Sequence, residues 1–322
     1  MDEAGTSLVG SWDEARMSQA AAEVQSTIDY LVPTSRINRR FWAPGKEFNT
    51  GVYASYPVTI RNARLAGPFT LDEHGFCLGR HRTAITDWEG QYGPDSAYTT
   101  QVAEVAMRLS GADVVVPMGG MMRTSGSTNT KVQPPAAEAH VDFTRSCAER
   151  RAETLYRNAH PRGAGYRRFI AFSLWRVLSA PPQDMPLALC EGRSVRDDEG
   201  THNTKVDVTE IPTGDALYAP IEGEENMAAA TIFHYSPAHR WWYFPDMEPD
   251  EVIFIKLYDS DHGKAWRCPH TAFRDTTRPD ARPRRSMEFR AMAYFGPRCA
   301  RDGAATQAAP ASSAALTHQP CT

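Results

Sequence analysis

The segment Ala139-His140-Val141-Asp142-Phe143 holds the pair of residues in this chain that is best suited to metal chemistry. In an extended strand, residues two apart point to the same face, about 6.5–7 Å apart along the backbone. An imidazole nitrogen of His140 and a carboxylate oxygen of Asp142 can therefore approach one ion. A further histidine would complete a set of two His and one carboxylate, which leaves open positions for O₂ and a co-substrate on non-haem Fe(II).

This triplet is a weak signal on its own, because chance alone would place about one His-x-acid triplet in a chain of this composition. Support comes from the order of the residues that follow. His270 falls in the next-to-last strand that the sequence predicts, and we favour it as the third ligand. His239 is the rival, but it follows the turn signal Ser236-Pro237, where a structural role is more common.

The last predicted strand begins with residues suited to bind a carboxylate. Arg284 and Ser286 share the parity of a strand, so a guanidinium and a hydroxyl can face the same interior. A guanidinium binds a carboxylate through two parallel hydrogen bonds, as the far carboxylate of 2-oxoglutarate would require. Arg290 has the same parity and is the reserve candidate. A surface position for Arg284, within the basic run at 278–285, is equally well supported at this point.

Two further charges interrupt predicted strands. Arg176 lies in the otherwise apolar stretch 169–178, and a buried Arg without a partner is costly. Contact with the co-substrate or substrate and an internal ion pair, for example with Glu288, are equally good explanations. Lys256 poses the same question, and there a surface role is favoured. The candidates for lining a substrate pocket are His239, Trp241, Tyr243 and Lys256.

The elements that must position these residues are mainly strands. From residue 168 on, short apolar segments are separated by turn signals without long helices between them. This pattern favours an antiparallel sandwich or barrel over a doubly wound sheet. The strands are expected at 169–178, 187–190, 231–235, 241–244, 252–258, around residue 270 and at 286–295.

The first half of the chain is expected to be more mixed. Apolar spacing predicts helices over 11–31, 101–109 and 146–160. Short strands are expected within 51–82 and a buried strand at 113–118. Residues 119–133 are rich in Gly, Ser and Thr and are predicted to form a mobile loop. We expect one domain over residues 1–297, mainly β with flanking helices, and a disordered tail over 298–322.

Composition excludes several functional classes. Hydrophobic residues make up 41% and charged residues 23%, with a net charge of −4, so there is no electrostatic case for a nucleic acid or an anionic membrane as partner. No apolar run is long enough to span a bilayer, and the acidic N-terminus argues against a secretory signal. Six scattered cysteines without a C-x-x-C motif are typical of reduced thiols in a cytoplasmic protein.

A series of segments in fixed order extends these observations from about residue 57 to residue 295. The most distinctive is residues 239–247, which read His-Arg-Trp-Trp-Tyr-Phe-Pro-Asp-Met. With these segments the chain resembles the fungal hydroxylase/desaturase family of Fe(II)/2-oxoglutarate-dependent oxygenases, which includes a gibberellin desaturase, the aspergillic acid hydroxylase and CmcJ-like proteins. The other segments are 69–76, 140–144, 174–178, 185–190, 250–251, 256–260, 269–273 and 284–290.

The resemblance implies a double-stranded β-helix, the jelly-roll or cupin-like fold. It implies Fe(II) bound by His140, Asp142 and His270 as the catalytic centre, with 2-oxoglutarate held by Arg284 and Ser286, and O₂ as oxidant. The implied activity is hydroxylation, desaturation or ring closure of a small molecule in secondary metabolism. The segment 119–133 and the C-terminal tail depart from the family pattern, and residues 196–230 show little resemblance to it. Neither the substrate nor the oligomeric state is indicated.

Two alternatives from other classes remain at this point. A methyltransferase is one, because CmcJ acts within a methoxylation pathway. It would need a Gly-rich turn between a strand and a helix, whereas Gly163-Ala164-Gly165 precedes a strand-like segment. A non-catalytic, metabolite-binding accessory protein with a vestigial iron site is the other, and the presence of all three proposed ligands counts against it. An iron enzyme that works without 2-oxoglutarate is a variant of the main hypothesis.

Overall fold

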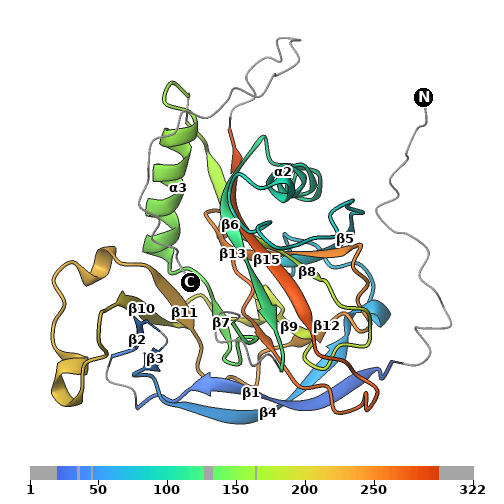
Figure 1. Cartoon of the computed structure of the whole chain (residues 1–322), viewed down its shortest axis with the longest axis horizontal. Coiled ribbons are helices and arrows are strands. Elements are labelled where there is room, and N and C mark those ends of the chain that lie inside the picture. Colours follow the sequence, from blue (N-terminus) through green and yellow to red (C-terminus); the bar gives the residue numbers. More distant parts are fainter. Residues whose placement is uncertain (1–19, 35–36, 45, 127–132, 164, 297–322) are drawn as a thin grey trace.

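The computed structural model describes residues 20–34, 37–44, 46–126, 133–163 and 165–296. Its strands form two sheets (Figure 1). In spatial order, sheet A consists of β1 (Glu23–Leu31), β4 (Tyr53–Asn62), β12 (Trp241–Tyr243), β9 (Leu187–Cys190), β14 (His270–Ala272), β7 (His140–Val141), β11 (Ala229–Ile232), β10 (Thr201–Asp207), β2 (Arg39–Ala43) and β3 (Lys46–Asn49). Sheet B consists of β5 (Phe76–Arg80), β13 (Glu251–Asp259), β8 (Arg168–Val177), β15 (Arg285–Phe295) and β6 (Val114–Thr124).

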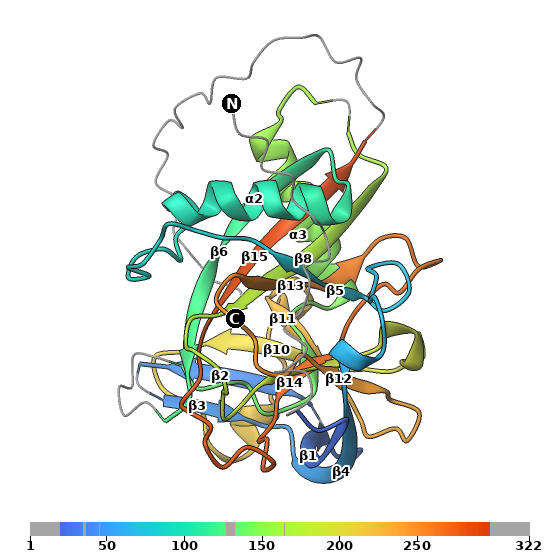
Figure 2. The same ribbon diagram turned by 90° about the vertical axis from the view of Figure 1, so that its right-hand side faces the viewer.

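Helix α2 (Ala97–Ser110) covers the outer face of sheet B, which it crosses in Figure 2. Its buried side chains Tyr98 and Val102 share a hydrophobic core with Phe172 and Phe289 of the sheet. The helix ends at Gly111, which has a φ of 71°, a left-handed conformation that glycine adopts without a steric penalty. The opposite face of sheet B is thereby left to meet sheet A.

The inner faces of the two sheets enclose the chemistry-bearing residues. One internal cavity is lined by His140, Leu187 and His270 of sheet A and by Trp175 and Ile255 of sheet B. Every residue of β13, and all but the first residue of β8, is buried. These two strands of sheet B are therefore covered on both faces. The sequence pattern for these strands is accordingly continuous rather than alternating.

Helix α3 (Arg145–Ala159) starts directly after β7. The Thr144 side chain caps it by accepting a hydrogen bond from the backbone N–H of Cys147, an arrangement typical of helix N-termini. Ala148 and Ala152 pack in the same core as Ala171 of β8. The helix therefore fixes the path of the chain just beyond β7.

Most of the predicted elements are confirmed. Helices α2 and α3 correspond to the helices expected at 101–109 and 146–160, and β9 coincides with the strand expected at 187–190. The other strands expected after residue 168 are also present, with ends that differ by a few residues. Within the described ranges, no helix combines the length and the apolar character that a membrane crossing requires.

The predicted helix over 11–31 is wrong for its second half. Residues 23–31 form β1, which pairs with β4 along its whole length, and residues 11–19 lie outside the described residues. Val24, Ile28 and Tyr30 are buried and share one parity. The apolar residues of this segment therefore fit both the alternation of a strand and the spacing of a helix. Pairing with β4 selects the strand.

One further prediction needs correction. Residues 119–124 are not a loop but complete β6; residues 127–132 lie outside the described residues. Gly120 is required because β15 runs close by, and a Cβ there would lie 2.7 Å from the backbone oxygen of Glu288. In the segment 196–230, the strand β10 joins β11 to β2. The predicted tail, with Cys299 and Cys321, lies outside the described residues, whereas the four described cysteines are buried.

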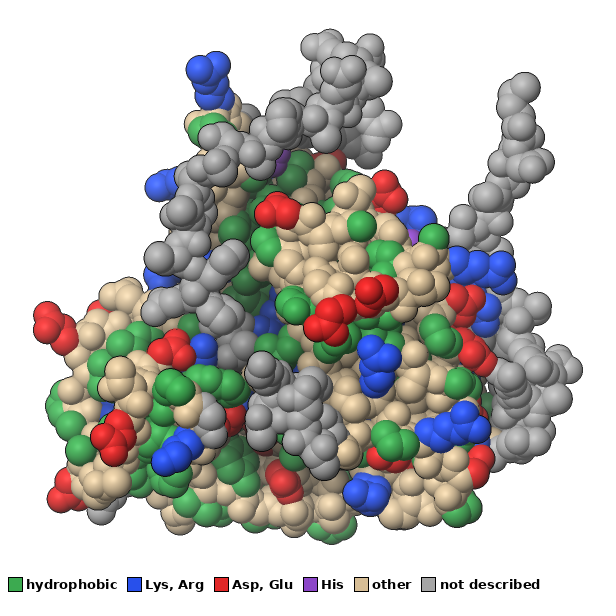
Figure 3. All heavy atoms as spheres, viewed as in Figure 1, with side chains coloured by type: hydrophobic (Ala, Val, Ile, Leu, Met, Phe, Trp, Pro, Cys, Tyr) green, Lys and Arg blue, Asp and Glu red, His purple; other side chains and the backbone are tan. Residues whose placement is uncertain are grey.

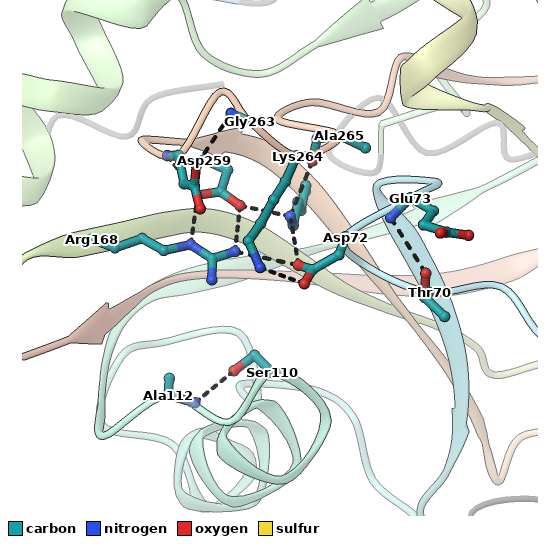
Figure 4. A network of polar contacts seen from close by, with 12 residues as sticks. Thr70, Asp72, Glu73, Ser110, Ala112, Arg168, Asp259, Gly263, Lys264 and Ala265 are labelled. Carbon is teal, nitrogen blue, oxygen red and sulfur yellow. Dashed lines mark hydrogen bonds and ion pairs between the residues drawn. The ribbon is translucent and has the colours of Figure 1, made fainter.

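A buried ionic network ties sheet B to two loops (Figure 4). The Asp259 carboxylate accepts hydrogen bonds from Arg168 Nη2 at 2.6 Å and from Lys256 Nζ at 2.6 Å. Lys264 pairs with Asp72 in the loop before β5, and Lys256 Nζ lies 3.8 Å from Asp72. Lys256 and Asp259 are both fully buried. Their charges are therefore stabilised by the ion pair between them rather than by water.

The face in Figure 3 shows blue Lys and Arg side chains interspersed with red Asp and Glu side chains. Among the coloured residues of this face, no extended patch of one sign is formed.

We expect Asp259→Asn to lower the free energy of unfolding by about 3–5 kcal/mol, because the buried Lys256 and the partly exposed Arg168 would lose their shared carboxylate. Urea unfolding followed by fluorescence measures the change. Lys264→Ala is the control, since this partly exposed residue should contribute no more than about 1 kcal/mol. Equal losses in the two variants would contradict a central role for Asp259.

Candidate metal centre

His140, Asp142 and His270 meet between the sheets. β7 and β14 are neighbours, and His140 is directly opposite His270. The ring centroids of the two histidines are 4.7 Å apart, and His140 Nε2 lies 3.5 Å from Asp142 Oδ1. One ligand atom from each of the three residues lies within 4.8 Å of the other two. These are the three residues that the sequence singled out.

Both imidazoles are held in the tautomer that a metal needs. His140 Nδ1 lies 2.8 Å from the backbone oxygen of Glu138, and His270 Nδ1 lies 3.1 Å from that of Cys268. A carbonyl oxygen only accepts, so each Nδ1 carries the hydrogen and donates it. The Nε2 lone pairs are then available for an ion, with the ring orientation fixed by the backbone.

The charge of Asp142 is stabilised by an arginine on the facing sheet. Arg290 Nε lies 3.0 Å from Asp142 Oδ2. Burial alone would raise the pKa of Asp142, but Arg290 and His140 hold the pKa well below its usual value. Burial, together with the charge of His140, lowers the pKa of His270 to about 4. At neutral pH the site thus offers a carboxylate and a neutral imidazole, the forms that bind metals.

Glu288 extends this contact into a chain of charges. Its carboxylate accepts a hydrogen bond from Arg290 Nη2 at 2.8 Å and one from Arg123 Nε at 3.0 Å. Burial would raise the pKa of Glu288, but Arg123 and Arg290 lower it overall. Arg123 is anchored in turn by the backbone oxygen of Pro134, 3.0 Å from its Nη1. Three guanidinium or carboxylate groups therefore stand behind Asp142 and fix its position.

Arg284 lies in the wall of the same cavity. It is only 2% exposed, it donates to the backbone oxygen of Met185 at 2.6 Å, and its guanidinium lies over the Trp175 ring. Its Nε and the buried Ser286 Oγ have no hydrogen-bond partner among the described residues. Burial, followed by the charge of Arg123, lowers the pKa of Arg284 to about 9. Leaving two buried donors without acceptors is costly. An anionic ligand that accepts hydrogen bonds from both would remove this cost.

Three of the residues expected to line a substrate pocket lie instead in the core of sheet A. His239 pairs with Glu199, 2.8 Å from Nε2, and its Nδ1 lies 3.1 Å from the Tyr30 hydroxyl. That hydroxyl also accepts a hydrogen bond from Trp241 Nε1. Tyr243 is buried in the same cluster. None of the three lines the cavity beside His140 and His270, and the structural role favoured for His239 agrees with these contacts.

Lys256 and Arg176 also lie away from the three ligands. Lys256 is fully buried, paired with Asp259, rather than at the surface. Arg176 faces α2: its Nη2 lies 2.7 Å from His81 Nδ1, and its guanidinium lies 5.1 Å from the centre of the Tyr98 ring. Arg176 does not line the cavity of the three ligands. Its partners are His81, the Tyr98 ring and the backbone oxygen of Pro249, which accepts a hydrogen bond from Nη1 at 3.2 Å.

Arg290, the reserve candidate for the co-substrate carboxylate, contacts Asp142 and Glu288 instead. Sequence reasoning missed Glu288 and Arg123 as site residues. Glu288 shares the parity of 284, 286 and 290 on β15, so the strand pattern could have revealed it. Arg123 falls within the stretch that was expected to be a loop, and no sequence signal placed it opposite Ser286.

Comparison with known proteins agrees with this geometry. A family model described as the oxidoreductase/YMDC permease-like domain matches residues 28–294. Hydroxylase/desaturase CTB9 of Cercospora beticola is 32% identical over 263 residues, 76% of this chain and 78% of that protein. The Fe(II)/2-oxoglutarate-dependent dioxygenase nvfI of Aspergillus novofumigatus is 30% identical over 260 residues, 79% of this chain and 88% of that protein.

The chain belongs to the fungal hydroxylase/desaturase family of Fe(II)/2-oxoglutarate-dependent oxygenases. The structure of the iron and alpha-ketoglutarate-dependent endoperoxidase NvfI matches this oxygenase with a TM-score of 0.71 and 24% identity, over 86% of this chain and 99% of that chain. The predicted family and the jelly-roll fold are thereby confirmed. This membership favours an oxidoreductase using Fe(II), 2-oxoglutarate and O₂ over the methyltransferase and non-catalytic alternatives.

We expect Arg290→Ala in this oxygenase to weaken Fe(II) binding by about 10- to 100-fold, because Asp142 would lose the group that fixes its second oxygen. Anaerobic titration calorimetry measures the affinity. The control is Arg285→Ala, an exposed arginine on the same strand, which should bind iron as the unmodified protein does. An unchanged affinity in Arg290→Ala would show that Asp142 needs no such support.

Proposed function

We propose that His140 Nε2, an Asp142 oxygen and His270 Nε2 bind Fe(II), and that Arg284 and Ser286 hold the far carboxylate of 2-oxoglutarate. The enzyme would use both, with O₂, to oxidise a small molecule of fungal secondary metabolism. The observation that carries this proposal is the meeting of two Nδ1-bonded histidines and one carboxylate at a single point between the sheets.

The donor set fits Fe(II). Two imidazole nitrogens and one carboxylate oxygen form the facial triad of non-haem iron oxygenases, which leaves positions for a chelating co-substrate and O₂. The second oxygen of Asp142 is occupied by Arg290, which favours binding of the metal through one oxygen only. The pKa shifts of Asp142 and His270 keep both in their metal-binding forms.

The environment of Arg284 fits a carboxylate. Its guanidinium, 2% exposed, is near Glu288 but forms no ion pair with a carboxylate among the described residues. Among the described residues, neither the Nε of Arg284 nor the hydroxyl of Ser286 has a hydrogen-bond partner. A dicarboxylate whose far end reaches them would satisfy both at once, and charge-assisted hydrogen bonds in a dry site are strong.

Bound Fe(II) and 2-oxoglutarate supply the oxidation by O₂ that removes hydrogen from the substrate. The protein itself holds the metal ligands and the co-substrate in position and excludes water from the site. Trp175, Leu187 and Ile255 form the apolar part of the cavity wall and exclude water. The Glu288–Arg290–Asp142 contacts hold one ligand in place, and the backbone holds the other two.

The outcome of the reaction is not fixed by the family. The relatives are named as hydroxylase/desaturase and as dioxygenase, and one solved structure is of an endoperoxidase. For this chain we propose hydroxylation, desaturation or ring closure. We also propose a cytoplasmic location, which the free, buried thiols of Cys77, Cys190 and Cys268 support. We further propose a single domain over residues 1–297, supported by a family match that spans most of it.

We expect His140→Ala and Asp142→Ala to abolish the Fe(II)-dependent conversion of 2-oxoglutarate to succinate, because each removes one of only three protein ligands. Succinate formed after adding O₂ measures turnover, and His262→Ala, which changes a histidine in a loop near Tyr258, is the control. Full turnover in either ligand variant would refute the assignment. In a metabolite screen, a gain of oxygen or a loss of two hydrogens then identifies the reaction.

We expect Arg284→Met to raise the KM for 2-oxoglutarate by about 100-fold while leaving the affinity for Fe(II) nearly unchanged, because the variant loses a charge-assisted contact to the co-substrate and no contact to the three metal ligands. Arg282→Ala, an exposed neighbour, should keep the normal KM. If Arg284→Met instead lowers iron affinity and leaves the KM intact, Arg284 supports the metal ligands and a different group binds the co-substrate.

A further inference from the structure

A cleft of about 590 Å³ lies between α3 and the end of β10. One wall is formed by Arg150, Arg151 and Thr154 of α3, and the other by Lys205 and Asp207 of β10. Gly223, Asn226, Met227 and Ala228 close the third side. A space of this volume is large enough for a small organic molecule or a substantial part of one.

The cleft is cationic. Three of its lining residues carry a positive charge, and Asp207 is the one acidic lining residue. Asp207 lies 3.1 Å from Lys205. Arg150 has a backbone contact, 3.5 Å from the oxygen of Met227. The Nε of Arg151 is buried and has no hydrogen-bond partner among the described residues. The excess of two positive charges in a concave site favours an anionic ligand.

The register of sheet A places this cleft on the side of the iron ligands. His140 is opposite Ile232 on β11, and Ile232 is opposite Thr201 on β10. Opposite residues share a face, and so do residues two and four further along a strand. Asn203 and Lys205 therefore lie on the same face of the sheet as His140. With two strand spacings and four residues between them, Lys205 is roughly 15 Å from His140.

Asn203 lies between the two sites on this face of the sheet. It lies on that face between Thr201 and Lys205, and it is only 5% exposed. Its side-chain oxygen has no hydrogen-bond partner among the described residues. A buried acceptor without a donor is costly unless a ligand supplies one. This second observation is independent of the charges in the cleft and also indicates a ligand on this face.

We propose that the cleft recognises an acidic group of the substrate, so that this oxygenase acts on an organic acid whose carboxylate lies roughly 15 Å from the carbon that is oxidised. This inference rests on the proposed function and adds a substrate class to it. Arg150 and Arg151 bind the carboxylate together with Lys205. The chain of the substrate then follows the face of β10 and β11, past Asn203, toward His140.

Linear acids of different charge test the proposal. The full-length protein is loaded anaerobically with Fe(II) and saturating 2-oxoglutarate, and calorimetry compares dodecanoate with the uncharged dodecanamide. We expect dodecanoate to bind at least about tenfold more tightly, as charge-assisted hydrogen bonds predict. Arg150→Ala/Arg151→Ala should abolish this preference. The matched control is Arg145→Ala/Arg157→Ala, which removes two exposed arginines from the same helix and should keep it.

A second measurement tests the direction of the bound chain. With Mn(II) in place of Fe(II), the terminal methyl protons of dodecanoate should relax faster in NMR than the protons next to the carboxylate, because the paramagnetic ion lies at the far end of the path. Equal binding of acid and amide, an unchanged preference in Arg150→Ala/Arg151→Ala, or faster relaxation at the carboxylate end would each overturn the proposal.

The same samples separate this inference from the function on which it rests. Addition of 2-oxoglutarate to the anaerobic Fe(II) protein should produce the visible absorption of an iron-bound keto acid. If this absorption is missing from the unmodified protein, the proposed function fails. If it is present in the unmodified protein and in both double variants, a missing preference for dodecanoate contradicts the substrate class alone.

Discussion

The site depends on one backbone pairing. β7 and β14 meet at a single pair of residues, and that pair is His140 and His270. Direct pairing in an antiparallel sheet brings side chains to within about 5 Å on one face, which is the separation that two ligands of one ion need. Asp142 then joins them because it lies two residues beyond His140. A shift of β14 by one residue would turn its imidazole to the other face of the sheet.

The facing sheet contributes charges rather than ligands. Four side chains of equal parity at 284, 286, 288 and 290 lie along the inner face at β15, and they divide into two tasks. Arg290 and Glu288 support Asp142 from behind, whereas Arg284 and Ser286 retain donors without partners. One strand thus fixes the metal site. Under the proposed function, the residue spacing along this strand also sets the distance between the metal and the far carboxylate of the co-substrate.

The sequence was most informative where one residue carries one chemical role. The triad His140, Asp142 and His270 followed from residue type, spacing and order, and the strands of sheet B followed from continuous apolar segments. It was least informative for buried polar residues such as Arg176 and Lys256, because their partners, His81 and Asp259, are chosen by tertiary packing. The strand β1 was misassigned because its apolar spacing also suits a helix, and only the pairing with β4 resolves that ambiguity.

The balance of charge around the triad has a consequence for the order of loading. When both imidazoles are in the neutral form that binds a metal, the guanidinium groups of Arg123, Arg284 and Arg290 exceed the carboxylates of Asp142 and Glu288 by one charge. A divalent ion alone adds two more positive charges to a poorly hydrated interior. The two negative charges of bound 2-oxoglutarate compensate them. Metal and co-substrate are therefore expected to bind with positive cooperativity, each strengthening the retention of the other.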